Sequence, residues 1–438
     1  MLKKLFDFKF VKDSIYTLIS FIIFALSGII TNVIIGNTYG SAELGIFNQA
    51  LALLMIFSLI SILGLNISSI KYVSQFKDSP TQQKEIFSSA SYMAVCLSVI
   101  ICLLLYFLIT MFPAVFFNKE VTHATAIVLL CLPLFSQNKI YMALMNGLRH
   151  MKVYAFVQSA RWLLIIGFIA CAVFLNKSIY FVCYCFLFSE ICIWIVCSIL
   201  YGKYFTLRFS SKLWFKNNLV FGSKSVLIGF LGETNNKIDI FFISFFLSNH
   251  YVGIYSFAST IVKGFLSISS VIQLNINPII SDLWAKKDSE AIKKYTLRIS
   301  KMMLFIMTPI LIIASIAYPI FINTFMTDPV YQASIPIFYI LLTGIFLPSV
   351  YYFSGAYLTM ANLLNITLRN MLIIIIYNAL SCFVFINLLG FIGASVSTAT
   401  TYIFSVFFSH YYIKKRMGIK LIQIKNPFKK YKKQITAN

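Results

Sequence analysis

The chain has 438 residues, of which 60% are hydrophobic, 17% aromatic and only 11% charged, and its mean hydropathy is +0.86. Soluble domains carry about 25% charged residues, so this composition excludes most soluble enzymes, secreted domains and disordered chains and indicates a polytopic membrane protein. The net charge of +23 would suggest nucleic acid in a soluble chain. No RNA-binding motif accompanies it, and in a membrane chain such a charge indicates orientation and contact with anionic lipid.

Twelve apolar runs are long enough to cross about 30 Å of hydrocarbon as helices. In chain order they cover residues 14–35, 44–66, 88–111, 122–144, 153–175 and 179–200, then 219–247, 252–278, 299–322, 335–353, 367–388 and 392–412. The first run is too long for a removable signal peptide and has no small-residue cleavage site, so we expect it to remain a helix. The predicted fold class is an all-α polytopic membrane protein with twelve transmembrane helices.

The basic residues predict the orientation of these helices. With the N-terminus in the cytoplasm, the cytoplasmic segments hold 27 of the 36 basic residues, and the outer loops hold only Lys119 and Lys177. This asymmetry follows the positive-inside rule and predicts that both termini are cytoplasmic, as an even number of spans requires. The loops are too short for a folded catalytic domain, so any chemistry is expected among the helices.

The chain also repeats itself at an offset of 208 residues. The matching residues lie at the turn between the first two spans and the turn between the seventh and eighth: Ile35, Gly45, Ile46 and Ala50 correspond to Ile243, Gly253, Ile254 and Ala258. The repeat predicts two pseudo-equivalent six-helix bundles related by an axis along the membrane normal. The expected domains are an N-terminal bundle at 1–200, a cytoplasmic linker at 201–218, a C-terminal bundle at 219–412 and a basic tail at 413–438.

Seven basic residues fall within the predicted spans. Lys301 and Arg369 lie near an inner end and are expected to snorkel toward the surface. The other five are Lys139, Arg161, Lys224, Lys237 and Lys263. Lys139 and Lys224 are intermediate in depth, and Arg161, Lys237 and Lys263 lie deep. A Lys or Arg at the bilayer centre costs about 2.5–3.5 kcal/mol, so we expect these three to face a water-filled cavity or a partner. The alternative is that they form structural ion pairs between helices.

Three carboxylates in the spans are candidate partners. Glu233 and Lys237 are four residues apart, so they share a helix face and can pair. Asp239 points elsewhere on the same helix, and its expected partner is Lys263 on the next one.

Glu190 in the sixth span is a candidate proton site; the alternative is a protonated acid or the partner of Arg161 on the fifth span. The nine cysteines lie inside apolar runs, and neither they nor the four histidines have the spacing of metal ligands. No phosphate-binding loop or hydrolase motif is present, so no catalytic residue, metal site or cofactor is predicted.

Three stretches resemble a known family. They read Tyr39-Gly-Ser-Ala-Glu-Leu-Gly45-Ile-Phe, the matching stretch from Asp239 through Gly253 to Ala258, and Gly390-x-x-Gly393-Ala394 followed by Thr398-Ala399-Thr400. Together with the two six-helix halves, they resemble the polysaccharide-transporter branch of the multidrug/oligosaccharidyl-lipid/polysaccharide exporter superfamily. The resemblance covers essentially the whole chain and implies a MATE-like fold.

In function, the resemblance implies a Wzx-type flippase. Such a protein moves undecaprenyl-diphosphate-linked oligosaccharide repeat units, for O-antigen lipopolysaccharide or another polymer, across the bacterial cytoplasmic (inner) membrane by alternating access. The expected partners are this lipid-linked oligosaccharide, membrane lipids, a coupling ion (H⁺ or Na⁺), and polymerase and chain-length proteins. Nucleic acid is not expected as a partner.

The deep cations fit that cargo because a diphosphate is an anion that cannot cross hydrocarbon unaided. The predicted substrate-binding residues are Lys224, Lys237 and Lys263 in the second half and Arg161 and Lys139 in the first. The predicted ion-coupling or positioning residues are Glu233, Asp239 and Glu190. The alternatives are a cation-coupled multidrug exporter of the same fold, a membrane polysaccharide polymerase, and a flippase for a peptidoglycan precursor or a teichoic-type polymer.

Overall fold

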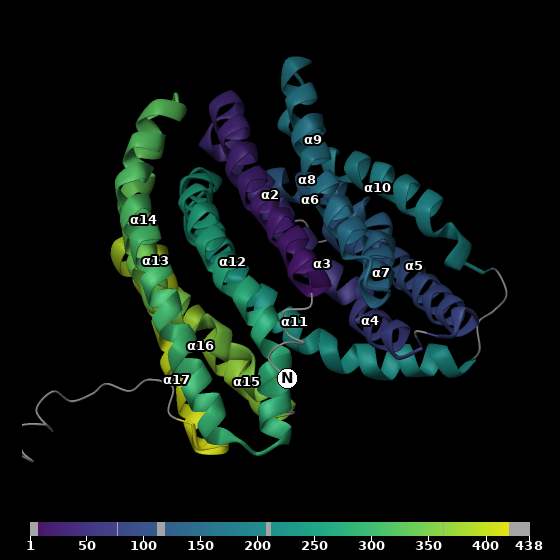
Figure 1. Ribbon diagram of the computed structural model, residues 1–438. Coiled ribbons are helices and arrows are strands. Elements are labelled where there is room, and N and C mark those ends of the chain that lie inside the picture. The colour runs from purple at the N-terminus through teal and green to yellow at the C-terminus, as the bar shows by residue number, and fades with distance from the viewer. Residues whose placement is uncertain (1–7, 77, 112–118, 207–211, 362, 420–438) are drawn as a thin grey trace, which may run out of the picture.

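The structure is a computed structural model that describes residues 8–76, 78–111, 119–206, 212–361 and 363–419. Within these ranges the chain is almost entirely helical and contains no strand (Figure 1). The predicted all-α class is therefore confirmed.

The helices follow the predicted spans in order. The first half contains α2 (Phe8–Tyr39), α3 (Ser41–Ile62), α4 (Leu65–Gln75), α5 (Pro80–Met111), α6 (Lys119–Leu129), α7 (Leu132–Gly147), α8 (Met151–Phe174), α9 (Ile179–Cys183) and α10 (Cys185–Tyr201). The second contains α11 (Lys212–Phe246), α12 (Asn249–Ala285), α13 (Ser289–Phe325), α14 (Ser334–Tyr351), α15 (Tyr357–Met360), α16 (Leu364–Leu389) and α17 (Phe391–Met417). Short 3₁₀ helices are η2 (Gly202–Tyr204), η3 (Pro329–Ala333) and η4 (Tyr352–Ala356). Each predicted span coincides with one helix or with two or more consecutive helices.

Several spans are broken within their length. The span predicted at 44–66 ends its first helix at Ile62, and Leu63 and Gly64 take left-handed backbone conformations before α4 begins. The span predicted at 122–144 consists of α6 and α7, which meet at 49°. Pro133 occupies the first turn of α7, where its missing N–H breaks no helical hydrogen bond. Such breaks allow polar backbone and side chains to face an interior space.

The number of spans is lower when it is judged by apolar character alone. Among the described residues, ten helices are long and apolar enough to cross a membrane, and the bent pair α6 and α7 makes eleven if it counts as one span. The helix α11, predicted as the seventh span, does not belong to this set. It carries Lys216, Lys224, Glu233, Lys237 and Asp239 within 35 residues. Its polarity indicates that much of its surface faces something other than lipid.

The two halves form two groups of helices that meet along α3 and α12. Figure 1 shows α2–α10 in one group and α12–α17 in the other, with α11 running from between them along the lower edge of the first. The helix α11 contacts α3, α4 and α5 in the first group and α12, α16 and α17 in the second. The predicted linker at 201–218 contains η2 and the start of α11 at Lys212. The helix that opens the second half therefore packs against both groups.

Candidate functional site

We use two names for the ends of the molecule. The turn face carries the α2–α3 turn at Gly40 and the α11–α12 turn at Ser248, and the terminal face is the end where α2 begins and α17 ends.

A cavity of about 420 Å³ lies between the first group of helices and α11. It brings together five of the predicted site residues: Lys139, Arg161, Glu190, Glu233 and Lys237. The remaining lining residues come from α2, α3, α4, α7, α8 and α10: Phe24, Leu51, Met55, Asn66, Ile70, Phe135, Met142, Ala143, Asn146, Tyr154, Gln158, Trp162, Ile165 and Phe186. Charges that are far apart in the sequence thus share one interior space.

Helical periodicity explains which side chains reach the cavity. From α8 the lining residues are Tyr154, Gln158, Arg161, Trp162 and Ile165. Their spacings of four, three, one and three residues follow one face of a helix with 3.6 residues per turn. The opposite face of α8 carries exposed apolar residues such as Phe156 and Leu163. The sequence of α8 thus directs one polar face inward and one apolar face toward lipid.

Arg161 is held in a buried ion pair. Its Nε lies 2.7 Å from Glu190 Oε1, and its Nη2 donates to Glu190 Oε2 at 3.2 Å. Asn138 Nδ2 donates to the same carboxylate at 2.7 Å. Arg161 is 5% exposed and Glu190 2% exposed. Of the expectations for Glu190, the structure shows the pairing with Arg161, so the charge of Arg161 is neutralised within the first bundle.

The two lysines of the cavity have no carboxylate partner within 4.0 Å in the described part of the chain. Among the described residues, ion pairs within 4.0 Å join Arg161 to Glu190, Lys263 to Asp239, Lys286 to Asp282 and Lys293 to Glu290. The expected pair between Glu233 and Lys237 is therefore not formed, although both side chains line the cavity. The spacing on the helix permits such a pair but does not require it.

Lys139 is positioned by neutral groups. Its Nζ donates to Ser58 Oγ at 3.3 Å and lies 4.6 Å from the centre of the Phe135 ring. A hydroxyl and an aromatic face orient an ammonium without cancelling its charge. Lys139 and Lys237 are thus the two cations of the cavity that can meet an anion directly.

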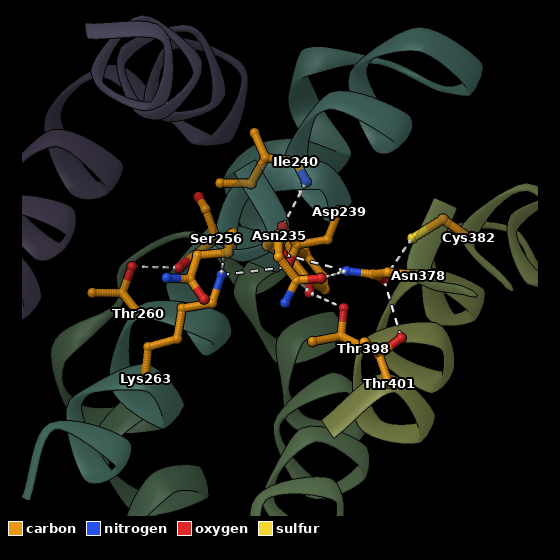
Figure 2. Close-up of polar contacts among 12 residues, drawn as sticks. Asn235, Asp239, Ile240, Ser256, Thr260, Lys263, Asn378, Cys382, Thr398 and Thr401 are labelled. Carbon is orange, nitrogen blue, oxygen red and sulfur yellow. Dashed lines mark hydrogen bonds and ion pairs between the residues drawn. The ribbon is translucent and has the colours of Figure 1, made fainter. Parts of the chain in front are cut away.

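A second polar cluster lies beside this cavity, in the second half (Figure 2). Lys263 on α12 reaches toward α11, where its Nζ donates to Asn236 O at 2.8 Å and lies 3.3 Å from Asp239 Oδ2. The same Oδ2 accepts a hydrogen bond from Tyr255 Oη at 2.5 Å. The side chain of Asp239 is 2% exposed and that of Lys263 25% exposed. The expected pair of Asp239 with Lys263 is therefore present.

Asn378 on α16 links this cluster to α17. Its Nδ2 donates to Asn235 Oδ1 at 3.1 Å, and its Oδ1 accepts from Thr401 Oγ1 at 3.2 Å (Figure 2). Thr398 Oγ1 on α17 lies 3.0 Å from Tyr255 Oη on α12, and this contact connects α17 to the group around Asp239. Asn378 and Tyr255 were not among the residues predicted from the sequence. The available signal was a single amide in the otherwise apolar run 371–386.

Lys224 was also a predicted substrate contact. It lies in α11, but its side chain falls outside the described part of the structure. Within the described part, no group of three or more His, Cys, Asp or Glu side chains has the arrangement of a metal site.

The turn face is closed by contacts between the two groups of helices. Ser41 Oγ lies 2.6 Å from His250 Nδ1, and Gln49 Nε2 donates to Asn249 Oδ1 at 2.8 Å. Asn37 Nδ2 donates to Phe325 O at 2.7 Å. All three contacts join the first half to the second. They hold the two groups of helices together at the turn face.

Comparison with known proteins identifies this architecture. The chain is similar in structure to a multidrug resistance MATE family transporter of the MOP superfamily in an inward-facing conformation, with a TM-score of 0.73, 13% identity and coverage of 92% of this chain and 98% of that one. It is also similar to the lipid II flippase MurJ in an inward closed conformation, with a TM-score of 0.71, 15% identity and coverage of 92% and 87%. At such identities the likeness shows a shared fold.

Sequence comparison adds the family. A search of curated protein sequences finds no match. The family profile described as polysaccharide biosynthesis protein matches residues 10–284, which is more than half of the chain. The chain therefore belongs to the polysaccharide biosynthesis protein family, as its turn motifs and two-bundle fold indicate.

Proposed function

We propose that the protein is a flippase that moves undecaprenyl-diphosphate-linked oligosaccharide repeat units across the bacterial cytoplasmic membrane by alternating access. The observation that carries this proposal is the cavity in which Lys139 and Lys237 stand without a carboxylate partner. A diphosphate carries its charge on oxygens that accept hydrogen bonds from ammonium groups. In an interior space of low dielectric constant, that attraction is stronger than in water.

The contacts on the turn face support an inward-facing resting state. In the proposed orientation the terminal face is cytoplasmic, because the predicted cytoplasmic segments hold 27 basic residues and the predicted outer loops two. The cavity then receives the glycolipid head group from the inner leaflet, where it is assembled. Opening of the turn face would release the head group toward the outer leaflet, where a polymerase and chain-length proteins would act on it.

Asp239 is the proposed ion-coupling group. Its carboxylate is buried, so removing its counter-ion without replacement is costly. Lys263 is partly exposed and can move from Asp239 to a substrate phosphate. Asp239 would then take up H⁺ or Na⁺ in its place, which links anion binding to cation binding. In this scheme Glu190 positions Arg161, and Glu233 tunes the charge of the cavity.

The charge balance argues against the main alternative. A cation exporter needs carboxylates that are free to bind its cargo. The cavity holds three bases and two acids, and because Glu190 is paired with Arg161, Glu233 stands alone against two lysines. A polymerase would need reactive groups on the outer side. The outer loops that the sequence predicts are too short to supply a domain for them.

The test is to delete the gene in its bacterium and measure lipid-linked oligosaccharide on each leaflet. The flippase predicts accumulation on the inner leaflet, restored by the wild-type gene. Lys237→Gln should restore flipping at least about tenfold less well, which corresponds to ~1.4 kcal/mol. Lys301→Gln is the matched control, since Lys301 is exposed on α13. An unchanged leaflet distribution with altered drug tolerance would favour the exporter.

A further inference from the structure

The lining of the cavity changes character from its terminal end to its interior. On α8, Tyr154 and Gln158 lie in the first two turns, Arg161 follows, and Ile165 lies deepest. On α7, which runs the opposite way, Asn146 lies at the terminal end and Lys139 about two turns deeper. Seven residues of helix rise by about 10 Å. We call the terminal end of the cavity, lined by Asn66, Asn146, Tyr154 and Gln158, its mouth. The charged side chains thus form a layer about 10 Å deeper than the mouth.

The polar side chains of the mouth make no hydrogen bond within the described structure. Asn66, Asn146, Tyr154 and Gln158 are half-buried, and none of their side chains takes part in a hydrogen bond within the described structure. The indole N–H of Trp162, at the boundary with the charged layer, is buried without an acceptor. Among the described residues, these side chains make no hydrogen bond with a neighbouring helix, so their donors and acceptors are available to a ligand in the cavity.

Amides elsewhere in the bundles behave differently. Asn138, Gln49 and Asn378 are buried and each donates to a side chain on a neighbouring helix. They hold helices together, as polar side chains in membrane proteins commonly do. The amides of the mouth make no such contact, so the need to join helices does not explain them.

The mouth also lacks charge. All five charged residues of the cavity lining belong to the deeper layer or to α11 opposite it, and the mouth presents amides, a phenol and short apolar side chains. An amide offers two donors and an acceptor in one plane, which matches hydroxyl or acetamido groups on adjacent carbons of a sugar ring. A charged sugar would find no counter-charge there.

We propose that Asn66, Asn146, Tyr154 and Gln158 form a subsite for a neutral sugar, next to the diphosphate layer of Lys139 and Lys237. This proposal rests on the proposed function, because the subsite would bind the sugar that is joined to the diphosphate. It gives the cavity two separate tasks. The lysines bind any prenyl diphosphate, and the mouth selects among the glycans attached to it.

The experiment compares two lipids on the purified full chain in nanodiscs. One is undecaprenyl diphosphate, and the other is undecaprenyl-diphosphate-linked N-acetylglucosamine, a neutral sugar. We expect the wild-type chain to bind the glycosylated lipid at least about tenfold more tightly, or ~1.4 kcal/mol. Gln158→Leu and Asn146→Leu should reduce that ratio to within about twofold of one while leaving the affinity for undecaprenyl diphosphate unchanged.

A matched control separates the two tasks. Lys237→Gln should weaken binding of both lipids equally and preserve their ratio. A wild-type chain that binds both lipids equally would overturn the sugar subsite while leaving the flippase proposal intact. A wild-type chain that binds neither lipid would overturn the proposed function itself. Since the decisive ratio is measured on the wild-type chain, the result does not depend on whether a variant folds.

Discussion

Asn48 and Ser256 are 208 residues apart in the sequence, and Asn48 Nδ2 donates a hydrogen bond to Ser256 Oγ at 2.9 Å. Their separation equals the offset of the internal repeat, so the two residues occupy equivalent positions in the two halves. Equivalent residues touch only where a pseudo-twofold axis passes between them. The axis thus runs between α3 and α12, at the junction that closes the turn face.

The same junction depends on two equivalent glycines. A Cβ added at Gly45 would lie 1.9 Å from Asn249 O, and one added at Gly253 would lie 1.9 Å from Ser41 O. Only glycine permits this approach of two backbones. Gly253→Ala should therefore push α3 and α12 apart and favour opening of the turn face.

Solvent accessibility of a thiol reports that opening. Ser41→Cys should react with a membrane-impermeant maleimide several-fold faster when Gly253→Ala is also present. Gly167→Ala on α8 is the control, because a Cβ there meets nothing within 4 Å. Equal labelling in both backgrounds would show that the glycine contact does not hold the face closed.

Locking the junction should stop transport. Asn48→Cys with Ser256→Cys, joined by a short bifunctional thiol reagent, ties the two bundles together across the axis. We expect flipping of the glycolipid to cease and to return on reduction. Ser61→Cys with Ser136→Cys is the matched pair, because these hydroxyls lie 2.9 Å apart within the first bundle. Normal flipping by the cross-linked Asn48–Ser256 pair would contradict alternating access through this face.

The buried pair of Arg161 and Glu190 makes a prediction about stability. Removing one partner leaves an uncompensated buried charge, which typically costs about 3–5 kcal/mol, whereas removing both costs much less. Arg161→Leu should thus lower the melting temperature of the purified protein, and Arg161→Leu with Glu190→Leu should recover most of the loss. If the double variant also flips glycolipid normally, Arg161 has a structural role and does not contact the substrate.

Asp239→Asn tests the coupling group. The amide keeps the shape of the side chain and can still accept the hydrogen bond from Tyr255, but it cannot neutralise Lys263 or take up a cation. Transport in proteoliposomes should lose its dependence on an imposed H⁺ or Na⁺ gradient while downhill movement of glycolipid persists. Retained dependence on both gradients would assign coupling to another residue, and Glu233→Gln would be measured next.

The pairing of the charged residues within the spans was only partly predictable from their spacing in the sequence. Glu233 and Lys237 have the ideal spacing for a helical pair and do not form one, whereas Asp239 finds Lys263 on a different helix. Asn378 looks like an isolated amide in an apolar run, yet it joins α11, α16 and α17. Spacing gives the direction of a side chain on its own helix. It does not give the rotation of that helix or the distance to its neighbours.

The sequence by itself determined the helical class, the positions of the long helices and the repeat at offset 208, because hydrophobic length and internal similarity are properties of consecutive residues. The tertiary structure decided which cations remain free. Among the described residues no carboxylate lies within 4.0 Å of Lys139 or Lys237, because the packing of α8 against α10 commits Glu190 to Arg161. Charge neutralisation depends on distances between helices, and those are fixed only when the bundles pack.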